Sequence, residues 1–379
     1  MKIAVIGYGR RIRNVIRELI VQDPTLELAA IVDVQNEAIK QAMTEREDRL
    51  PEFYDTFAEM KERVKPDGVL IGTRCSLHAR LAAEVLSSGI PLFLEKPVAT
   101  TLEDLKLLKQ AYDRYPAEVV VSFPLRVTPM VSLVKEILDS GKIGTVEHVQ
   151  AVNNVPYGGV YYHHWYRDEN ETGGLFLQKA THDFDYLQHL IGGHPTDVCA
   201  MVSKQIFRGD KPAGLKCADC EEKLTCKEST YGVVRSEDTT PAGEYCAFAV
   251  DTGNEDSGSA LIRYESGMHV SYSQNFFARR KAASRGARLL GYKGTLEFDF
   301  YTDEIKVFPH HSPHTEVYRM DGSEAHFGGD QVLADNFLKV MRGEARSSSD
   351  MNSGLLSALV CLKARESSLT GTFQTVDWR

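Results

Sequence analysis

Residues 175–185, with the sequence LFLQKATHDFD, place a lysine, a histidine and two acids among apolar side chains that would otherwise form a buried helix. Burying a charge is unfavourable by several kcal/mol unless the group is paired or used. A histidine such as His182 can take up and release a proton near neutral pH. The segment therefore predicts either a polar network whose groups satisfy one another or part of an active site.

A second candidate for chemistry is Lys96, within the stretch PLFLEKP at 91–97. The apolar part of this stretch predicts a strand, and Lys96 follows it directly. Ligands of a parallel sheet bind at the carboxyl ends of its strands, so a lysine held there is placed to act on a bound substrate. The alternative is a surface lysine, but the residues at the neighbouring strand ends favour the functional interpretation.

The N-terminal part of the chain has the pattern of such a sheet. A strand-like run at 2–6 is followed at once by GYGRRIRNVIREL, a glycine turn that opens an amphipathic helix. Gly7 would allow the tight turn, and Gly9 would let the backbone approach a pyrophosphate at the helix N-terminus. Ile12 stands where the pattern G-x-G-x-x-G has its third glycine, so this motif alone is weak.

The next predicted strand, LELAAIVDV, ends in Asp33. An acid at this strand end binds the ribose hydroxyls of NAD and repels the additional phosphate of NADP, so we expect NAD rather than NADP. Arg10 and Arg11 could donate to a phosphate, or could be solvated helix charges. The expected cofactor-binding residues are Gly7, Gly9, Arg10, Arg11, Asp33, Thr73, His78, Glu95 and Lys96.

The alternation of strands and helices predicts an α/β Rossmann domain over residues 1–124. From 125 to 379 the pattern changes to short strands separated by glycine turns, the mark of consecutive hairpins, with helix-like stretches near 173–191, 328–343 and 352–370. We expect an α+β substrate and oligomerisation domain with a large open antiparallel sheet, interrupted by a cysteine-containing insertion at 208–244. The predicted strands are 145–155, 197–207, 245–252, 258–266, 267–276, 287–292, 294–300 and 304–310.

Composition limits the partners. The net charge is −9 and no compensating basic run is present, which argues against nucleic acid or an anionic membrane. No apolar run approaches the roughly 20 residues of a membrane span. The N-terminal MKIAVIG enters a strand directly and lacks the features of a signal peptide. We therefore expect a cytoplasmic protein with a small-molecule substrate.

The 7 cysteines include a C-x2-C-x5-C group formed by Cys217, Cys220 and Cys226. This is the spacing of one half of a structural zinc site, to which Cys246 or Cys199 could add the fourth ligand. No second C-x2-C pair follows, so a loop with reduced cysteines is favoured and no metal is expected.

The whole pattern resembles the Gfo/Idh/MocA family of oxidoreductases. The resemblance covers essentially the whole chain and is carried by GYGRR, VDV, LFLEKPVA, GGLFLQKATHDFDYLQHLIG and HFGGDQVLADNFLKVMRG. It implies an enzyme that uses NAD or NADP to oxidise or reduce a hydroxyl of sugars, inositols or related polyols. It also implies a homodimer or homotetramer that associates through the outer face of the sheet.

The resemblance also implies residue roles. Lys96 matches the family's active-site lysine, and His182 matches its catalytic histidine. On a helix, Asp185 would lie one turn after His182 and could orient its ring. In alcohol oxidation a hydride leaves carbon for the nicotinamide while a base takes the hydroxyl proton. His182 suits the base role, and the ammonium of Lys96 would stabilise the developing alkoxide.

One position departs from the family pattern. Many sugar dehydrogenases of the family carry an aspartate four residues before the histidine, and this chain has Gln178 there, followed by Lys179. Glutamine accepts no proton at any useful pH, so an aspartate–histidine relay is unavailable. Lys179 either faces the pocket as a second cation, which would suit an acidic or ketone-bearing substrate, or pairs with a neighbouring acid.

The loop YGGVYYHHWYRDENETGG precedes this helix and is rich in aromatic residues and histidines. Such residues bind carbohydrates through flat faces for C–H surfaces and polar edges for hydroxyls; the alternative is ordinary loop packing. The expected substrate-binding residues are Arg126, Tyr161, His163, His164, Trp165, Arg167 and Gln178.

The sequence thus predicts an NAD-dependent dehydrogenase of a sugar, sugar derivative or cyclitol, with Lys96, His182, Asp185 and Lys179 as its catalytic residues. Two alternatives remain open. NAD could oxidise a hydroxyl transiently, permit elimination of a glycosidic substituent and take its hydride back, which would make the protein a lyase or glycosidase. The chain could also be a non-catalytic nucleotide sensor, which would have no need of Lys96 and His182.

Overall fold

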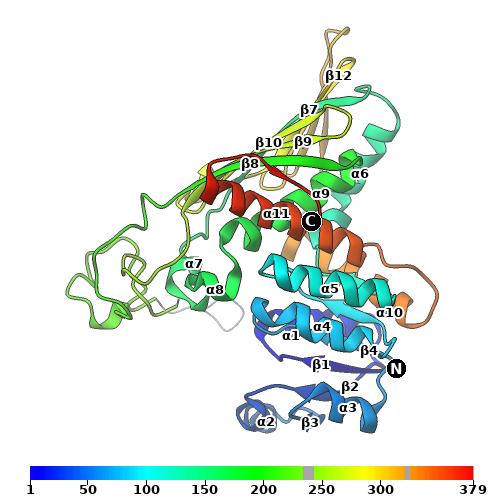
Figure 1. Cartoon of the computed structure of the whole chain (residues 1–379), viewed down its shortest axis with the longest axis vertical. Helices are drawn as coiled ribbons and strands as arrows, with labels where there is room; N and C mark the ends of the chain where they lie inside the picture. Colours follow the sequence, from blue (N-terminus) through cyan, green and yellow to red (C-terminus); the bar gives the residue numbers. More distant parts are fainter. Residues whose placement is uncertain (234–242, 321–324, 379) are drawn as a thin grey trace. The chain divides into compact units, whose positions relative to one another are not determined.

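The computed structural model of the chain describes residues 1–233, 243–320 and 325–378 (Figure 1). The chain divides into two compact units, which are described one at a time. The first unit comprises Met1–Ser132, Phe184–His189 and Gly322–Leu359, and the second comprises Leu133–Asp183, Leu190–Asp321 and Val360–Arg379.

The first unit is built on a parallel six-stranded sheet of order β3-β2-β1-β4-β5-β6. Its central strands are buried almost throughout, which is why they appear in the sequence as continuous apolar runs. The strand order reverses between β1 and β4, the point at which such sheets bind ligands. The strands are β1 (Lys2–Ile6), β2 (Glu27–Val32), β3 (Glu52–Tyr54), β4 (Gly68–Ile71), β5 (Leu92–Leu94) and β6 (Val119–Val121).

This arrangement confirms the predicted Rossmann fold. Helices alternate with the strands, as the sequence pattern indicates (Figure 1). They are α1 (Arg10–Gln22), α2 (Asn36–Glu45), α3 (Phe57–Val64), α4 (His78–Leu86) and α5 (Leu102–Arg114).

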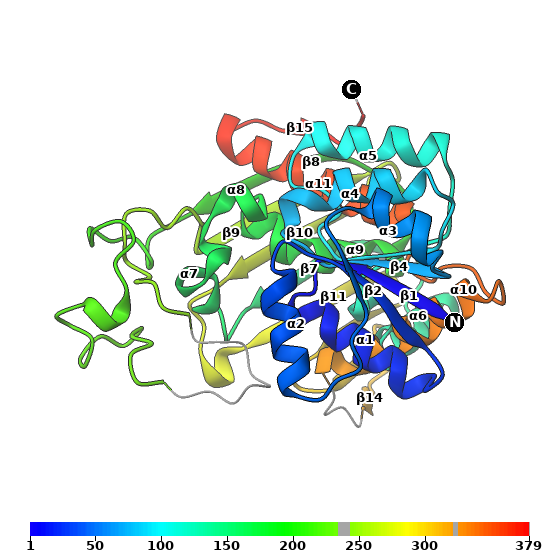
Figure 2. The ribbon, with the colours of Figure 1, turned by 90° about the horizontal axis from the view of Figure 1, so that it is seen from below.

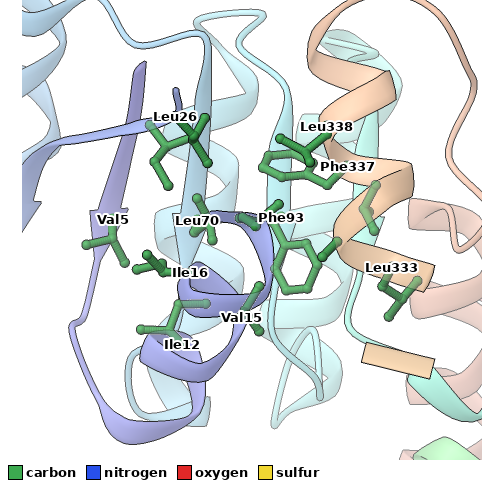
Figure 3. Close-up of a cluster of buried hydrophobic side chains, with 14 of the residues drawn as sticks. Val5, Ile12, Val15, Ile16, Leu26, Leu70, Phe93, Leu333, Phe337 and Leu338 are labelled. Carbon is green, nitrogen blue, oxygen red and sulfur yellow. The ribbon is translucent and has the colours of Figure 1, made fainter. Parts of the chain in front are cut away.

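The first unit also takes in α10 (Gly329–Met341), from the C-terminal part of the chain. Its buried face packs on α1 and on β5, and the rings of Phe93 and Phe337 meet edge to face with centroids 5.6 Å apart (Figure 3). Leu333 and Leu338 belong to the same buried cluster as Val15. Burial of apolar side chains of this size stabilises by about 1.5–3 kcal/mol each, which explains why this helix joins a sheet formed by a distant part of the sequence.

The second unit contains a nine-stranded sheet of order β14-β13-β12-β11-β7-β10-β9-β8-β15. It is antiparallel except where β7 runs parallel to β10, so the predicted large antiparallel sheet is confirmed with one parallel pair. The strands are β7 (Val146–Asn154), β8 (Pro195–Ser203), β9 (Ser257–Tyr264), β10 (His269–Asn275), β11 (Ser284–Gly291), β12 (Gly294–Asp299), β13 (Glu304–Pro309), β14 (Glu316–Arg319) and β15 (Gln374–Thr375).

The prediction of a strand at 245–252 is wrong. These residues form turns and isolated bridges. Their apolar side chains, Ala247 and Phe248, instead pack with Tyr162 and Phe207 in a separate buried cluster. The alternating apolar pattern thus arises from packing of the long segment between β8 and β9 on itself and on Tyr162.

That segment extends from the sheet beside α7 (Val160–His163) and α8 (Glu169–Thr172) (Figures 1 and 2). It contains the predicted insertion 208–244, of which residues 234–242 lie outside the described residues. Short 3-10 helices occur at Cys75–Leu77, Pro124–Val127, Trp165–Arg167, Cys217–Asp219, Arg280–Ala282 and Ala325–Gly328.

The predicted helix at 173–191 has two parts. Phe176–Ala180 is a π-helix, and α9 (Thr181–Ile191) continues directly from it. A π-turn accommodates an additional residue and is frequent at functional sites. It therefore changes the direction of the side chains before His182 relative to a regular α-helix. The remaining helices are α6 (Pro129–Asp139) and α11 (Met351–Thr370).

Candidate active site

The glycine turn after β1 has the geometry of a nucleotide-binding loop. Gly7 has a φ of +82°, and a Cβ atom there would lie 2.6 Å from Cγ2 of Thr73, so only glycine fits. Gly9 is the N-cap of α1, and the nearest atom to a Cβ built on it is 3.6 Å away. The N-terminal amides of α1 are therefore approachable by a pyrophosphate, as predicted for Gly7 and Gly9.

The close approach of α1 to the sheet depends on Gly72, which lies outside the glycine motif that the sequence shows. A Cβ atom on Gly72 would lie 2.6 Å from Cβ of Ile12. In G-x-G-x-x-G loops the third glycine provides this close packing between helix and strand. Here the small residue lies at the end of β4 and the large one on α1, so the missing glycine of the motif is compensated from the neighbouring strand.

Asp33 lies beside the same loop. Its Oδ2 accepts a hydrogen bond from the backbone amide of Tyr8 (2.7 Å), and its Oδ1 accepts one from that of Gln35 (2.8 Å). These bonds fix the carboxylate at the carboxyl end of β2, next to the glycine turn. This is the location that a ribose-binding acid requires, and together with Gly7 and Gly9 it fits a nicotinamide dinucleotide.

Arg11 has a structural environment. Its guanidinium donates to Glu95 Oε1 (2.9 Å), and it forms two hydrogen bonds to the carboxylate of Asp330 (2.7 and 2.6 Å). Burial lowers the pKa of Arg11, but the two carboxylates raise it by more, so the guanidinium stays charged. Arg11 thus ties α1 to the ends of β5 and α10, and its donation to a phosphate stays a prediction. Arg10 is partly buried on the same helix.

His78 supports the turn that carries Lys96. Its ring nitrogens lie 2.8 Å from the carbonyl oxygen of Pro97 and 3.3 Å from that of Thr73. Burial lowers the pKa of His78, which favours the neutral ring. His78 therefore links the ends of β4 and β5, and Lys96 is partly exposed in the turn between them.

Asp185 and Arg126 form a buried ion pair in the first unit, with Oδ2 and Nε 3.1 Å apart. Arg126 also donates to Ser353 Oγ (3.0 Å). Burial raises the pKa of Asp185 to about 7, because the loss of hydration outweighs the attraction of Arg126, and Asp350 adds to the rise. Arg126, expected to bind substrate, is thus engaged with Asp185, and the orientation of His182 by Asp185 stays a prediction.

The second unit places a buried carboxylate, Asp183, at the centre of a polar network. Asp183 has an exposed fraction of 0%. It accepts hydrogen bonds from Asn153 Nδ2, Tyr272 Oη and Arg285 Nε, each at 2.7 Å. A polar network is one of the two alternatives that residues 175–185 predict, but its partners from the sheet were not predicted. Their signal in the sequence is that Asn153 and Arg285 occupy inward-facing strand positions where the alternation predicts apolar residues.

Lys179 lies in the π-helix and is almost fully buried. Its Nζ donates to the hydroxyl of Tyr157 (2.6 Å) and lies 4.7 Å and 5.5 Å from the ring centroids of Tyr157 and Tyr161. Within the described part of the chain its contacts are thus with aromatic residues. Both expectations for Lys179, an open cation in the pocket and a partner of an acid, are replaced by a buried ammonium beside a phenol.

The other predicted residues of this region are also largely buried. Gln178 and His182 are both enclosed, at the π-helix and at the start of α9. His163 Nδ1 lies 2.6 Å from the carbonyl oxygen of Tyr245. Arg167 donates to Thr252 Oγ1 (2.9 Å) and is paired with Asp251. These contacts attach His163 and Arg167 to the segment between β8 and β9.

Trp165 stacks on Tyr166 with ring centroids 3.9 Å apart, and both rings are partly exposed, as is His164. Tyr161 is buried between Tyr166 and Phe276, each with its centroid 5.5 Å away. Of the residues predicted to bind substrate in this loop, His164 and Trp165 are partly exposed, whereas Tyr161, His163 and Arg167 are buried.

The cysteines of the insertion are all reduced in the structure. A hydrogen bond with His163 lowers the pKa of the Cys217 thiol to about 7, against the opposing effect of burial. No group of three or more His, Cys, Asp or Glu side chains among the described residues is arranged to hold a metal ion. Within the same residues, no helix combines the length and apolar character needed to cross a membrane.

The N-terminal and C-terminal parts of the chain match two different domain models of known proteins. Residues 1–123 match the sequence model of an oxidoreductase family with an NAD-binding Rossmann fold, and residues 131–297 match the GFO/IDH/MocA C-terminal domain. Together the two matches cover well over half of the chain.

Curated relatives include the oxidoreductase YteT of Bacillus subtilis (strain 168), which is 27% identical over 327 residues, or 76% of each chain. Inositol 2-dehydrogenase of Rhizobium meliloti (strain 1021) is 28% identical over 148 residues, which make up 39% of this chain and 43% of that protein. The chain therefore aligns with less than half of the inositol enzyme.

Among solved structures, levoglucosan dehydrogenase in complex with NADH and L-sorbose is similar with a TM-score of 0.79. The similarity covers 100% of this chain and 99% of that one at 18% identity, which is a likeness of fold.

Proposed function

Because this chain belongs to the Gfo/Idh/MocA family of NAD(P)-dependent oxidoreductases that act on CH–OH groups, we propose that it is an NAD-dependent dehydrogenase of a sugar, a sugar derivative or a cyclitol. The observation that carries the proposal is the carboxylate of Asp33, fixed by two backbone amides beside the glycine turn of a Rossmann sheet. The relatives named as inositol 2-dehydrogenase and levoglucosan dehydrogenase support the substrate class.

Each residue of the first unit has a defined task in this proposal. The amides that follow Gly9 bind the pyrophosphate, and Asp33 accepts hydrogen bonds from the ribose hydroxyls and thereby selects NAD. The bound nicotinamide supplies the acceptor for the hydride. Lys96, at the end of β5, stabilises the negative charge that develops on the substrate oxygen. His78 and Glu95 hold the turn that presents Lys96.

In the second unit, His182 takes the hydroxyl proton, since an imidazole exchanges protons near neutral pH. Gln178 and the exposed edges of His164 and Trp165 contact the substrate hydroxyls and C–H faces. The buried pair Arg126–Asp185 fixes the part of α9 that follows His182.

The proposal extends to a cytoplasmic enzyme that forms a homodimer or homotetramer. The free thiols of its cysteines support the cytoplasmic location, because free thiols persist in a reducing compartment. The outer face of the nine-stranded sheet supports the proposed homo-oligomer. A hollow of about 700 Å³ lies there, and the outward-facing Leu261 and Met201 expose apolar surface beside it.

The test is an incubation of the purified protein with NAD and a panel of polyols, uronates and glycosides. Reduced-nicotinamide absorbance and substrate loss are followed in the same samples. A dehydrogenase gives a rise in absorbance with the substrate of one class. Substrate loss without that rise would replace the proposal by a lyase or glycosidase with internal redox, and NAD binding without either change would indicate a sensor.

A further inference from the structure

We propose that Asp330 is a positioning residue of this enzyme and holds Lys96 in place through Arg11 and Glu95. This role rests on the proposed dehydrogenase function, in which Lys96 stabilises the charge that develops on the substrate oxygen. The four residues all belong to the first unit, so the contacts between them lie within one compact part of the protein. The helix α10 then contributes to the chemistry as well as to the apolar packing on α1.

Glu95 anchors the turn that carries Lys96. It follows β5 directly and precedes Lys96 in the chain, and its exposed fraction is 6%. Burying a carboxylate is unfavourable unless it is paired and hydrogen-bonded. Oε1 of Glu95 accepts hydrogen bonds from Arg11 Nε and from Ser122 Oγ, each 2.9 Å away. Because the backbone continues from Glu95 into Lys96, these two bonds also fix the start of Lys96.

The other side of the turn is held by His78. Nδ1 of its ring lies 2.8 Å from the carbonyl oxygen of Pro97. Lys96 therefore lies between two anchored residues, Glu95 and Pro97. A long lysine side chain reaches a defined position only if its backbone is fixed, and a misplacement of about 1 Å at a reacting group can reduce the rate about 100-fold. Loss of either anchor is thus expected to slow the reaction.

Asp330 sets the direction of the Arg11 guanidinium. The two carboxylate oxygens of Asp330 accept hydrogen bonds from Nη1 and Nη2 of Arg11, at 2.7 and 2.6 Å. Such a bidentate pair fixes the plane of the guanidinium as well as its distance. With both Nη atoms held by Asp330, Nε points at Glu95. Without Asp330 the guanidinium can turn on its side chain, and Glu95 then loses a fixed partner.

The position of Arg11 on α1 is not explained by the stability of that helix. Arg11 is the second residue of α1, and the N-terminus of a helix carries a partial positive charge that disfavours a cation. Residues 10–13, RRIR, contain no acid that could offset this charge. The compensating carboxylates come from Glu95 and from Asp330, which lies in the first turn of α10, where an acid is favoured. A local rule is thus broken at Arg11 and compensated by distant partners, as is expected where function determines the residue.

A second ion pair joins the same two helices at their opposite ends. Arg342, at the C-terminal end of α10, donates from Nη2 to Oδ2 of Asp23, at the C-terminal end of α1, over 2.8 Å. With 13 residues, α1 is about 20 Å long, so this pair lies at the far end of the helix from Arg11. It ties α10 to α1 but is too distant to support the turn at Lys96, which makes Asp23 a matched control for Asp330.

The test compares Asp330→Asn with Asp23→Asn, since each removes one charge from an ion pair between α1 and α10. The first readout is amide hydrogen exchange of the peptide that spans residues 94–98, followed by mass spectrometry without cofactor or substrate. Asp330→Asn is expected to speed this exchange by about tenfold or more, because charge-assisted hydrogen bonds that hold the turn are lost. Asp23→Asn is expected to leave it at the parent rate.

A further variant covers the case in which Asp330→Asn does not fold. Arg11→Lys keeps the positive charge, but an ammonium lacks the planar fork that bonds Glu95 and Asp330 at once. It is therefore expected to speed exchange of the turn in the same way.

The second readout is kcat with the substrate found in the NAD panel. Asp330→Asn is expected to lower kcat by about tenfold or more, with the Kd for NAD within about twofold of the parent value. In the Lys96→Ala background the same change is expected to have no additional effect on kcat, because Asp330 acts through Lys96. Asp23→Asn is expected to match the parent protein.

Unchanged exchange or unchanged kcat in Asp330→Asn would overturn the proposal. An additional loss in the double variant, or an equal loss in Asp23→Asn, would do the same. Turnover by the parent protein tests the proposed function separately. Absence of that turnover removes the proposed function and the role of Asp330 with it, whereas turnover by the parent combined with any of the contrary results removes the role of Asp330 alone.

Discussion

At the scale of single residues, the candidate site contains some residues that the sequence predicted and others that only the structure showed. Gly7 and Asp33 were predicted from the sequence because the Rossmann pattern fixes a residue type at a strand end. Asp183 and Gly72 were not, since each contacts a partner far away in sequence. Strand alternation shows that a polar residue faces inward, but not which partner it meets there.

The first residue-scale prediction concerns the choice of cofactor. Replacing Asp33 by alanine removes the carboxylate that would accept bonds from the ribose, so NAD affinity is expected to fall by about tenfold or more. NADP affinity is expected to fall less, because the repulsion of its phosphate is relieved at the same time. Calorimetric titration with both dinucleotides measures the two changes. Equal losses would refute the assignment of Asp33.

Lys96→Ala separates binding from chemistry. The ammonium is proposed to act on charge that develops during reaction, so its loss is expected to reduce kcat by about 100-fold or more while the Kd for NAD stays within about twofold. Initial rates and fluorescence titration with NAD measure the two quantities. Retained turnover would remove Lys96 from the mechanism, and lost NAD binding would assign it to the cofactor.

Because the pKa of Asp185 is raised by burial, we expect the stability of the protein to depend on pH. Burial raises its pKa from 3.8 to about 7, so between these values the folded protein keeps a proton that the unfolded chain has lost. The contribution of Asp185 to the free energy of unfolding is complete below its pKa in the unfolded chain. It declines as the pH rises toward its pKa in the folded protein, about 7.

Asp185→Asn, which holds no titrating proton, lacks this dependence. The free energy of unfolding of the parent protein minus that of the variant is expected to fall between about pH 4 and pH 7, by at most about 1.4 kcal/mol per pKa unit. Denaturant titrations across this range measure the difference. Parallel curves for the two proteins would show that the carboxyl is already charged in the folded state.

At the scale of elements, the periodicity of apolar residues predicted most helices and strands. It did not predict which strands lie next to each other in the sheet. The hairpin pattern places consecutive strands side by side, whereas β7 lies between β10 and β11 and runs parallel to β10. The apolar run at 245–252 was taken for a strand because its side chains are buried, although they are buried in a cluster with Tyr162 and Phe207. The π-helix before α9 has no signal in the 3.6-residue period.

The contact between α1 and β4 yields the element-scale prediction. Gly72→Ala would place a methyl group 2.6 Å from Cβ of Ile12, which must push α1 away from the sheet. Both NAD affinity and thermal stability are expected to fall. Adding Ile12→Gly removes the opposing side chain and restores the usual glycine pattern.

The double variant is therefore expected to lose less NAD affinity than the sum of the two single losses, a coupling of about 0.5–3 kcal/mol. Kd values for all four proteins complete this cycle. Additive losses would show that Gly72 and Ile12 do not share one packing constraint.

At the scale of the whole molecule, the family and its fold followed from motifs distributed along the entire chain, and both are confirmed. The sequence could not indicate that α10 belongs to the first unit, because an amphipathic helix carries no information on which sheet it covers.

Self-association is the prediction at this scale. Leu261 is 50% exposed on the outer face of the sheet, so Leu261→Arg is expected to shift the assembly toward monomers by placing a charge in an apolar contact. Leu369→Arg, which changes a 78% exposed leucine of α11, is the control. Sedimentation velocity compares them. A parent protein that sediments as a monomer would contradict the proposed assembly.

The most direct test of the central claim is the stoichiometry of the reaction of the parent protein with NAD and its substrate. Reduced nicotinamide formed and substrate consumed are measured over the same interval, with the oxidised product identified by mass. A net dehydrogenase predicts equal amounts and a product lighter by the mass of one hydrogen molecule. Substrate consumption without reduced nicotinamide, or a product formed by elimination, would contradict the account.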